Sequence, residues 1–266
     1  MTLPLGGRLA LVTGALGRLG PVWCEALLDA GAAVIGLDLP EATSSERFNG
    51  LQQRAGDRLR LMRADVLDRA SLLAIRDRCE VEGRTPVVLV NNAGIDQPPG
   101  PATHFRIEEI PLEIFRGVVD VNLIGAFQVS QVFGPAMLQA RRGAIINIGS
   151  LYASVSPDAR FYDHLLSDPP FLKPPAYGAS KAALVNLTRY LAAHWGPLGV
   201  RVNALSPGGV EGGQDPEFKR KFTARVPLCR MAAAEDLSGP LIFLASDASS
   251  YVTGIDLRVD GGFTSW

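Results

Sequence analysis

VTGALGRLG, residues 12–20, joins an apolar run to a segment with a helical period. Glycines at these spacings permit a tight turn after a strand. They also let backbone N–H groups at a helix N-terminus approach an anionic ligand without obstruction by side chains. A glycine triplet by itself often marks only a turn. Because this one lies between the first expected strand and the first expected helix, it indicates a pyrophosphate-binding loop.

Apolar, β-branched runs alternate with helix candidates along the rest of the chain. The expected strands are 9–13, 33–37, 59–63, 87–91, 144–148, 200–205 and 255–259, and the expected helices lie near 19–30, 69–81, 111–140, 177–195 and 235–246. Strands that are continuous hydrophobic runs favour a parallel sheet covered by helices on both faces. The sequence therefore predicts one α/β domain over residues 1–266, with a doubly wound, mostly seven-stranded parallel sheet.

The composition argues against several classes of protein. The formal net charge of −1 gives no general attraction to nucleic acid or to an anionic membrane. Cys24, Cys79 and Cys229 are not closely spaced, which indicates neither a disulfide framework nor a zinc site. The three histidines have no ligand spacing either, so no metal is expected. The N-terminus lacks a signal-peptide pattern, and no apolar run is expected to cross a bilayer. We expect a cytoplasmic protein.

Asp38 lies at the end of the second expected strand. A carboxylate there can accept hydrogen bonds from the ribose hydroxyls of an adenosine, and it would repel a 2′-phosphate. Leu39 offers no positive charge for such a phosphate, so the pair favours NAD over NADP. Arg18 keeps NADP open as the less favoured alternative, because it is expected near the phosphates and could reach further.

Tyr177 and Lys181 lie four positions apart in YGASK, residues 177–181. On a helix the two side chains would project from one face. An ammonium close to a phenol lowers its pKa, which starts near ~10, toward the range in which tyrosine acts as a general acid or base. Taken alone, the pair is better explained as a tyrosine at a helix start and a lysine that snorkels from a buried helix.

Residues 156–175, called the insertion below, have five prolines and no sustained period. Long irregular segments in compact domains are usually functional or mobile. Its polar side chains could face a substrate: Arg160, Tyr162, His164 and Lys173. An equally weighted alternative is a loop that stabilises the fold or contacts another subunit. Residues 208–226, a second glycine-rich and charged stretch, are expected to form the opposite wall of a substrate site.

Several motifs together resemble the short-chain dehydrogenase/reductase family. They are the glycine loop, Asn91-Asn92-Ala93-Gly94 after the fourth strand, Ser150 followed by Tyr177-x-x-x-Lys181, and the closing segments 251–254 and 259–262. The resemblance spans nearly the whole chain, and it implies a Rossmann fold that binds a nicotinamide dinucleotide.

The resemblance implies four catalytic residues. Ser150 would hydrogen-bond the reacting oxygen, and Tyr177 would exchange the proton. Lys181 would lower the pKa of Tyr177 and hold the nicotinamide ribose. Asn122 would support a water that links Lys181 to solvent; without the family, it would be interpreted as a helix-packing residue satisfied by backbone groups.

The resemblance also implies a set of coenzyme contacts. These are Gly14, Gly17, Arg18, Leu19, Gly20, Asp38, Asp65, Val66, Asn91, Ala93, Gly94, Tyr177, Lys181, Pro207, Gly208 and Val210. Asn91 and Asn92 could instead stabilise the turn through their own side chains. The chain departs from the family at Arg18, where the middle glycine is commoner. Residues 209–212 also lack the usual hydroxyl side chain, so a contact with the carboxamide would come from backbone.

The expected function is NAD(H)-dependent interconversion of a secondary alcohol and a ketone. The polar, proline-stiffened rim favours a small, sugar-like or otherwise polar hydroxylated substrate. One alternative is an NADP-dependent reductase of 3-oxoacyl thioesters or small ketones, and another is a dinucleotide-binding regulator without turnover. The helices that contain Asn122 and Tyr177 resemble the family's four-helix contact between subunits, which implies a homotetramer, with a dimer as the alternative.

Overall fold

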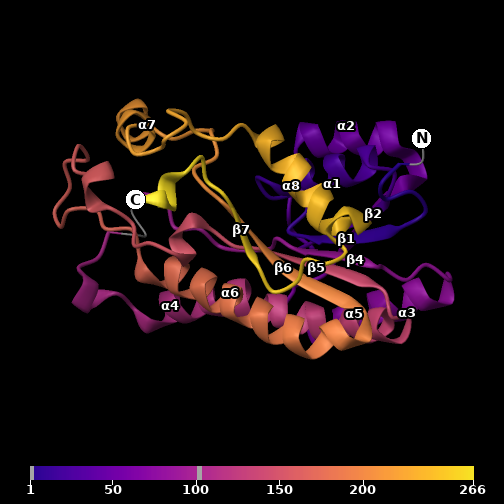
Figure 1. Ribbon diagram of the computed structural model, residues 1–266. Helices are drawn as coiled ribbons and strands as arrows, with labels where there is room; N and C mark the ends of the chain where they lie inside the picture. Colours follow the sequence, from indigo (N-terminus) through magenta and orange to yellow (C-terminus); the bar gives the residue numbers. More distant parts are fainter. Residues whose placement is uncertain (1–2, 101–103) are drawn as a thin grey trace.

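Seven parallel strands form one sheet in the computed structural model, which describes residues 3–100 and 104–266 (Figure 1). The strands are β1 (Leu9–Thr13), β2 (Ala33–Asp38), β3 (Leu59–Arg63), β4 (Val88–Asn91), β5 (Gly143–Ile148), β6 (Val200–Pro207) and β7 (Asp256–Val259). Their order is β3-β2-β1-β4-β5-β6-β7. The winding direction reverses between β1 and β4, and ligands bind outside the carboxyl ends of the strands at such a reversal. The predicted doubly wound α/β fold is confirmed.

Helices cover both faces of the sheet (Figure 1). They are α1 (Gly20–Asp29), α2 (Glu46–Ala55), α3 (Arg69–Val81), α4 (Leu112–Val119), α5 (Ala126–Gln139), α6 (Pro175–Trp195), α7 (Pro216–Thr223) and α8 (Ser238–Ala245). Apolar residues of α1, α2 and α8 pack with one set of strand side chains, and those of α3, α5 and α6 pack with the other. Alternation along β1 shows the division, since Val12 belongs to the first cluster and Leu11 to the second.

The helix expected at 111–140 is α4 and α5 joined by a π-helical turn, Asp120–Gly125. By length and composition, Leu112–Gln139 could cross a bilayer, contrary to the sequence-based expectation. Half of its most apolar window is buried within the fold, where Val129, Phe133 and Met137 pack against the sheet. Burial in the core accounts for its apolar character.

A third apolar cluster lies outside the two faces of the sheet. It joins the insertion, α7 and the C-terminal turn, and its members are Leu151, Phe161, Tyr162, Phe171, Phe218, Phe222, Val226, Met231 and Phe263. The ring centroids of Phe161 and Phe222 are 5.7 Å apart, and those of Phe222 and Phe263 are 4.9 Å apart. Aromatic packing therefore orders the insertion, which has little regular structure.

Candidate active site

A cavity of about 840 Å³ opens at the carboxyl ends of the strands. Asp38, Asp65 and Val66 line one end, and Ser150, Tyr177 and Lys181 line the other. The insertion and the 208–226 segment supply further walls. This volume lies within the range of about 300 to 1,000 Å³ that is usual for small-molecule and cofactor sites.

The glycine loop packs too tightly to accept side chains at two of its positions. Gly14 has φ +62°, and a Cβ there would lie 2.8 Å from the Cα of Ala93. A Cβ at Gly20 would lie 2.3 Å from the carbonyl oxygen of Ala15. Gly20 is buried at the start of α1 and does not line the cavity, so it acts by closing the turn. The expected residues that line the cavity from this loop are Gly14, Gly17, Arg18 and Leu19.

Asn91 and Asn92 have different roles. Asn91 is buried, and its Nδ2 donates to Ser130 Oγ (3.0 Å) and Asn147 Oδ1 (2.8 Å). Its side chain therefore has a structural role in the core and does not line the cavity, and its expected coenzyme contact stays a prediction. Asn92 Nδ2 donates to the carbonyl oxygen of Gly14 (2.9 Å), which joins the turn after β4 to the glycine loop.

Backbone groups hold the Asp38 carboxylate in place. Its Oδ2 accepts from the Leu16 N–H (2.7 Å), and its Oδ1 accepts from the Leu39 N–H (2.9 Å). Arg18 Nη2 donates to the carbonyl oxygen of Val210 (2.7 Å), so its guanidinium is directed to the 208–226 segment. Pro207, Gly208 and Val210 line the cavity on that side, and Ala93 and Gly94 line it beneath.

Ser150, Tyr177 and Lys181 meet at the inner end of the cavity. Ser150 follows β5 in an extended conformation, and its side chain hydrogen-bonds that of Tyr177. Tyr177 and Lys181 lie in the first two turns of α6, with the Lys181 Nζ 5.8 Å from the centroid of the Tyr177 ring. Lys181 Nζ also donates to the carbonyl oxygen of Ile148 (2.7 Å). The site thus combines a hydroxyl, a phenol and an ammonium.

Burial is the largest cause of the pKa shifts of Tyr177 and Lys181. It raises the pKa of the Tyr177 phenol above its usual range, and the charge of Asp96 adds to this, whereas the hydrogen bond from Ser150 acts in the opposite direction. Burial also lowers the pKa of Lys181 to about 8, against the opposing effect of Asp96. The expected lowering of the Tyr177 pKa by Lys181 is therefore not found in this structure, because burial is the largest cause of the shift and raises the pKa.

Asn122 lies in the π-helical turn and is fully buried. Its Oδ1 accepts from the Ile95 N–H (2.7 Å), and its Nδ2 donates to the Ile95 carbonyl (3.1 Å) and to Ser180 Oγ (3.0 Å). Its side chain therefore fixes the segment after β4 against α6 and does not line the cavity. The water relay through Asn122 stays a prediction.

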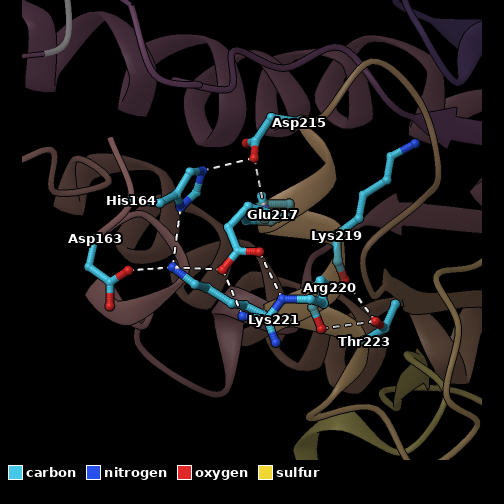
Figure 2. A network of polar contacts seen from close by, with 9 residues as sticks. Asp163, His164, Asp215, Glu217, Lys219, Arg220, Lys221 and Thr223 are labelled. Carbon is cyan, nitrogen blue, oxygen red and sulfur yellow. Dashed lines mark hydrogen bonds and ion pairs between the residues drawn. The ribbon is translucent and has the colours of Figure 1, made fainter. Parts of the chain in front are cut away.

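Of the insertion's candidate residues, Tyr162 and Lys173 line the cavity. Arg160 does not: its side chain is 80% exposed and pairs with Asp158. His164 does not line it either, but its Nε2 lies 2.8 Å from the Oδ1 of Asp215, which does (Figure 2). The irregular backbone of this segment gave no period from which the direction of these side chains could be predicted.

The sequence analysis missed several polar residues that line the cavity. Asp96, Tyr152, Gln214 and Asp215 are among them. Asp96 had a usable signal, because it is a carboxylate two residues after the glycine of the Asn-Asn-Ala-Gly turn. Gln214 and Asp215 lie within the stretch expected as a substrate wall, but nothing in the sequence distinguished them from their neighbours.

Comparisons with known proteins agree with this arrangement. A family model described as enoyl-(acyl carrier protein) reductase matches residues 14–264. Galactitol 2-dehydrogenase of Rhizobium johnstonii is 36% identical, over 98% of this chain and 97% of its own. A short-chain dehydrogenase from Leptospira borgpetersenii with bound NAD⁺ is 33% identical, with TM-score 0.84, over 97% of this chain and 93% of that chain. A gluconate 5-dehydrogenase from Burkholderia cenocepacia, in complex with NADP and tartrate, is 30% identical, with TM-score 0.84, over 100% of this chain and 98% of that chain.

Proposed function

The chain belongs to the short-chain dehydrogenase/reductase family, and on that premise we propose that it interconverts a secondary alcohol and a ketone with NAD(H). The proposed substrate is sugar-like or otherwise polar and hydroxylated, and the proposed location is the cytoplasm. The observation that carries the reaction is the hydrogen-bonded pair Ser150 and Tyr177 beside Lys181, in the same cavity as Asp38.

The residues present fit a dinucleotide. At Gly14 and Gly20 any side chain would collide with backbone, so the loop keeps its N–H groups and the start of α1 close to the cavity. Asp38 at the far end is a fixed acceptor for ribose hydroxyls. When bound, the nicotinamide supplies the capacity to accept or donate hydride. Lys181, on the cavity wall, would hold the ribose next to it.

The protein's own groups handle the substrate oxygen and its proton. Ser150 and Tyr177 would both hydrogen-bond the reacting oxygen, since their side chains already meet. In alcohol oxidation the phenolate form of Tyr177 would accept the hydroxyl proton as the ketone forms, and in the reverse direction the phenol would return that proton. The buried Lys181 provides a positive charge beside the phenol when a proton leaves it.

The preference for NAD rests on Asp38 and Arg18. The Asp38 carboxylate, held by the Leu16 N–H, would repel a 2′-phosphate on the adenosine ribose, and Arg18 is held by the Val210 carbonyl. Fluorescence titration should show NADH binding at least about tenfold tighter than NADPH, a difference of about 1.4 kcal/mol. The double variant Asp38→Ser/Leu39→Arg should lose this preference, whereas Asp29→Ser, an exposed carboxylate at the end of α1, should keep it. Tighter binding of NADPH to the unmodified protein would contradict the proposal.

The reaction is tested with a panel of polyols and sugars and NAD⁺, with absorbance at 340 nm as the readout. We expect NADH to form with at least one polyol. A second candidate is an NADPH-dependent reductase of 3-oxoacyl thioesters, because a solved structure that is 31% identical is named a 3-oxoacyl-[acyl-carrier protein] reductase. Acetoacetyl-CoA with NADPH is therefore the comparison assay, and turnover there without polyol oxidation would replace the first proposal. A regulator without turnover would bind coenzyme and be inactive in both assays.

A further inference from the structure

Asp96 and Lys173 form an ion pair on the cavity wall beside Tyr177. Lys173 Nζ lies 2.5 Å from Asp96 Oδ1 and 5.2 Å from the centroid of the Tyr177 ring. Asp96 comes from the segment after β4, and Lys173 comes from the insertion. Two parts of the chain that are far apart in sequence thus place opposite charges next to the reacting end of the cavity.

The two members of the pair differ in accessibility. The Lys173 side chain is only 6% exposed, whereas that of Asp96 is 56% exposed. Asp96 Oδ1 also accepts from the Gln97 N–H (2.9 Å), so within the described residues its hydrogen bonds fall on Oδ1. A buried ammonium therefore fixes the carboxylate, while Oδ2 is left to accept a hydrogen bond from a ligand.

The negative charge of Asp96 affects the pKa values of three tyrosines at this end of the cavity. Burial is the largest cause of the raised pKa values of Tyr152, Tyr162 and Tyr177, and the charge of Asp96 adds to each of them. Asp215 is a second carboxylate that lines the cavity. An ionised carboxylate is an acceptor only, so it suits a hydroxyl donor and repels another carboxylate.

We propose that Asp96, held by Lys173, accepts a hydrogen bond from a second hydroxyl of the substrate, so that the site selects neutral polyols over the corresponding sugar acids. This inference rests on the proposed alcohol oxidation. Similar proteins are named for a neutral polyol, galactitol, and for a sugar acid, gluconate, and the inference predicts that this site favours the first kind of substrate.

The test compares kcat/KM for alditols, for the aldonates of matching configuration and for cyclohexanol, which has a single hydroxyl. The unmodified protein should favour the best alditol over its aldonate by about tenfold or more. In Asp96→Asn, the ratio of alditol to cyclohexanol should fall about 10- to 100-fold, the effect of losing a hydrogen bond to a charged group. The preference for alditol over aldonate should fall as well, because Lys173 is then free to pair with the acid.

Lys173→Met should have the opposite effect to Asp96→Asn on the selection between neutral alditols and anionic aldonates. It keeps the carboxylate but removes the cation, so rejection of aldonates should increase while alditol kcat/KM falls roughly three- to tenfold as Asp96 loses its charge-assisted hydrogen bond. Asp77→Asn is the matched control, since Asp77 also pairs at 2.5 Å, with Arg76, but lies on α3 outside the cavity. If Asp96→Asn fails to fold in a thermal melt, Asp96→Asn/Lys173→Met removes both charges and serves for the alditol-to-cyclohexanol comparison.

Two results would overturn the inference alone: a preference of the unmodified protein for aldonates, or an equal loss with alditols and cyclohexanol in the Asp96 variant. Both leave the proposed reaction standing, because alcohol is still oxidised. If no alcohol in the panel is turned over with either coenzyme, the proposed function and this inference are both wrong.

Discussion

The Tyr177 phenol has three polar neighbours, one hydroxyl and two ammonium groups. Ser150 hydrogen-bonds it, and the Nζ atoms of Lys181 and Lys173 lie 5.8 Å and 5.2 Å from its ring centroid. Burial nevertheless holds the pKa of Tyr177 above its usual range. A phenol that is protonated at neutral pH is suited to donate a proton to a ketone. Only its phenolate can accept a proton from an alcohol, and a nearby cation stabilises that form.

Replacement of Tyr177 by Phe removes the proposed proton-transfer group and leaves the ring. We expect turnover to fall about 100- to 10,000-fold, the usual worth of a positioned acid or base. NADH affinity and melting temperature should be little changed. Tyr251→Phe is the matched control, because Tyr251 is fully exposed and does not line the cavity. Near-normal turnover of Tyr177→Phe would exclude the role.

The lowered pKa of Lys181 predicts a pH dependence of stability. In the folded protein Lys181 releases its proton near pH 8, whereas in the unfolded chain it does so near about 10.4. Between these values the unfolded state binds more protons, so the free energy of unfolding should rise with pH, by up to about 1.4 kcal/mol per unit. Urea unfolding at pH 7, 8 and 9 should show this contribution, and Lys181→Met should lack it. Equal pH slopes for the two proteins would contradict the lowered pKa.

For single residues, the residue type and its spacing in the sequence were enough to predict some members of the candidate site but not others. Ser150, Tyr177 and Lys181 were predicted because helical spacing places the last two together and the family resemblance adds the first. The difference between Asn91 and Asn92 was not predictable, since it depends on where β4 ends and the turn begins. Arg160 was misplaced because a loop without a period does not reveal the direction of a side chain.

At the level of elements, the insertion and α7 are joined by a polar network as well as by aromatic packing. Lys221 on α7 contacts Asp163, with its Nζ 3.3 Å from His164 Nδ1 and 3.5 Å from Glu217 Oε1 (Figure 2). His164 in turn contacts Asp215, which caps α7 by accepting from the Phe218 N–H. Since Asp215 and Phe218 line the cavity, this network ties its rim to the insertion.

Lys221→Met should loosen the rim without disturbing the coenzyme end. Exposed ion pairs are each worth about 0.2 to 1 kcal/mol, so we expect KM for the alcohol to rise roughly three- to tenfold while NADH affinity stays the same. Hydrogen exchange in residues 156–175 should also become faster. Lys219→Met is the control on the same helix, because Lys219 points away from the network (Figure 2). Unchanged KM and unchanged exchange in Lys221→Met would show that the rim does not depend on this contact.

The helices α2 and α7 were missed for a common reason. Each buries only two side chains, Phe48 and Leu51 in α2 and Phe218 and Phe222 in α7, so neither shows a strong apolar stripe. Their N-caps, Ser45 and Asp215, are clear in the structure but are common residues in loops. Five strands, β1, β2, β4, β5 and β6, are nearly continuous buried runs, which made them easy to find, whereas β3 and β7 at the edges of the sheet are only partly buried.

For the whole molecule, the parallel sheet and its helical layers followed from the alternation of elements, while the strand order was implied only by the resemblance. The order matters because the reversal between β1 and β4 places the glycine loop, the turn after β4 and Ser150 around one cavity. These segments lie far apart in the sequence. A pattern with periods of two and 3.6 residues contains no information about which strands become neighbours.

The exposed apolar residues of the layer formed by α4, α5 and α6 suggest that this face is covered by another copy of the chain. Leu112, Ile124 and Tyr190 are exposed there, although large apolar side chains are usually buried. With the family's helix contact as the expected interface, we propose a homotetramer. Light scattering after gel filtration should then give about four times the chain mass of 28.4 kDa.

Ile124→Asp tests this assembly, because Ile124 is 46% exposed and a carboxylate there costs little in an isolated chain but much in an apolar interface. The measured mass should fall to that of a dimer or a monomer. Val81→Asp is the control: Val81 is 89% exposed at the end of α3, outside the proposed contact, and its substitution should leave the mass unchanged. If the unmodified protein is a dimer and Ile124→Asp converts it to a monomer, the proposed interface is correct, but the number of subunits is two and not four. A monomer at micromolar concentration would show that the exposed face has no partner copy.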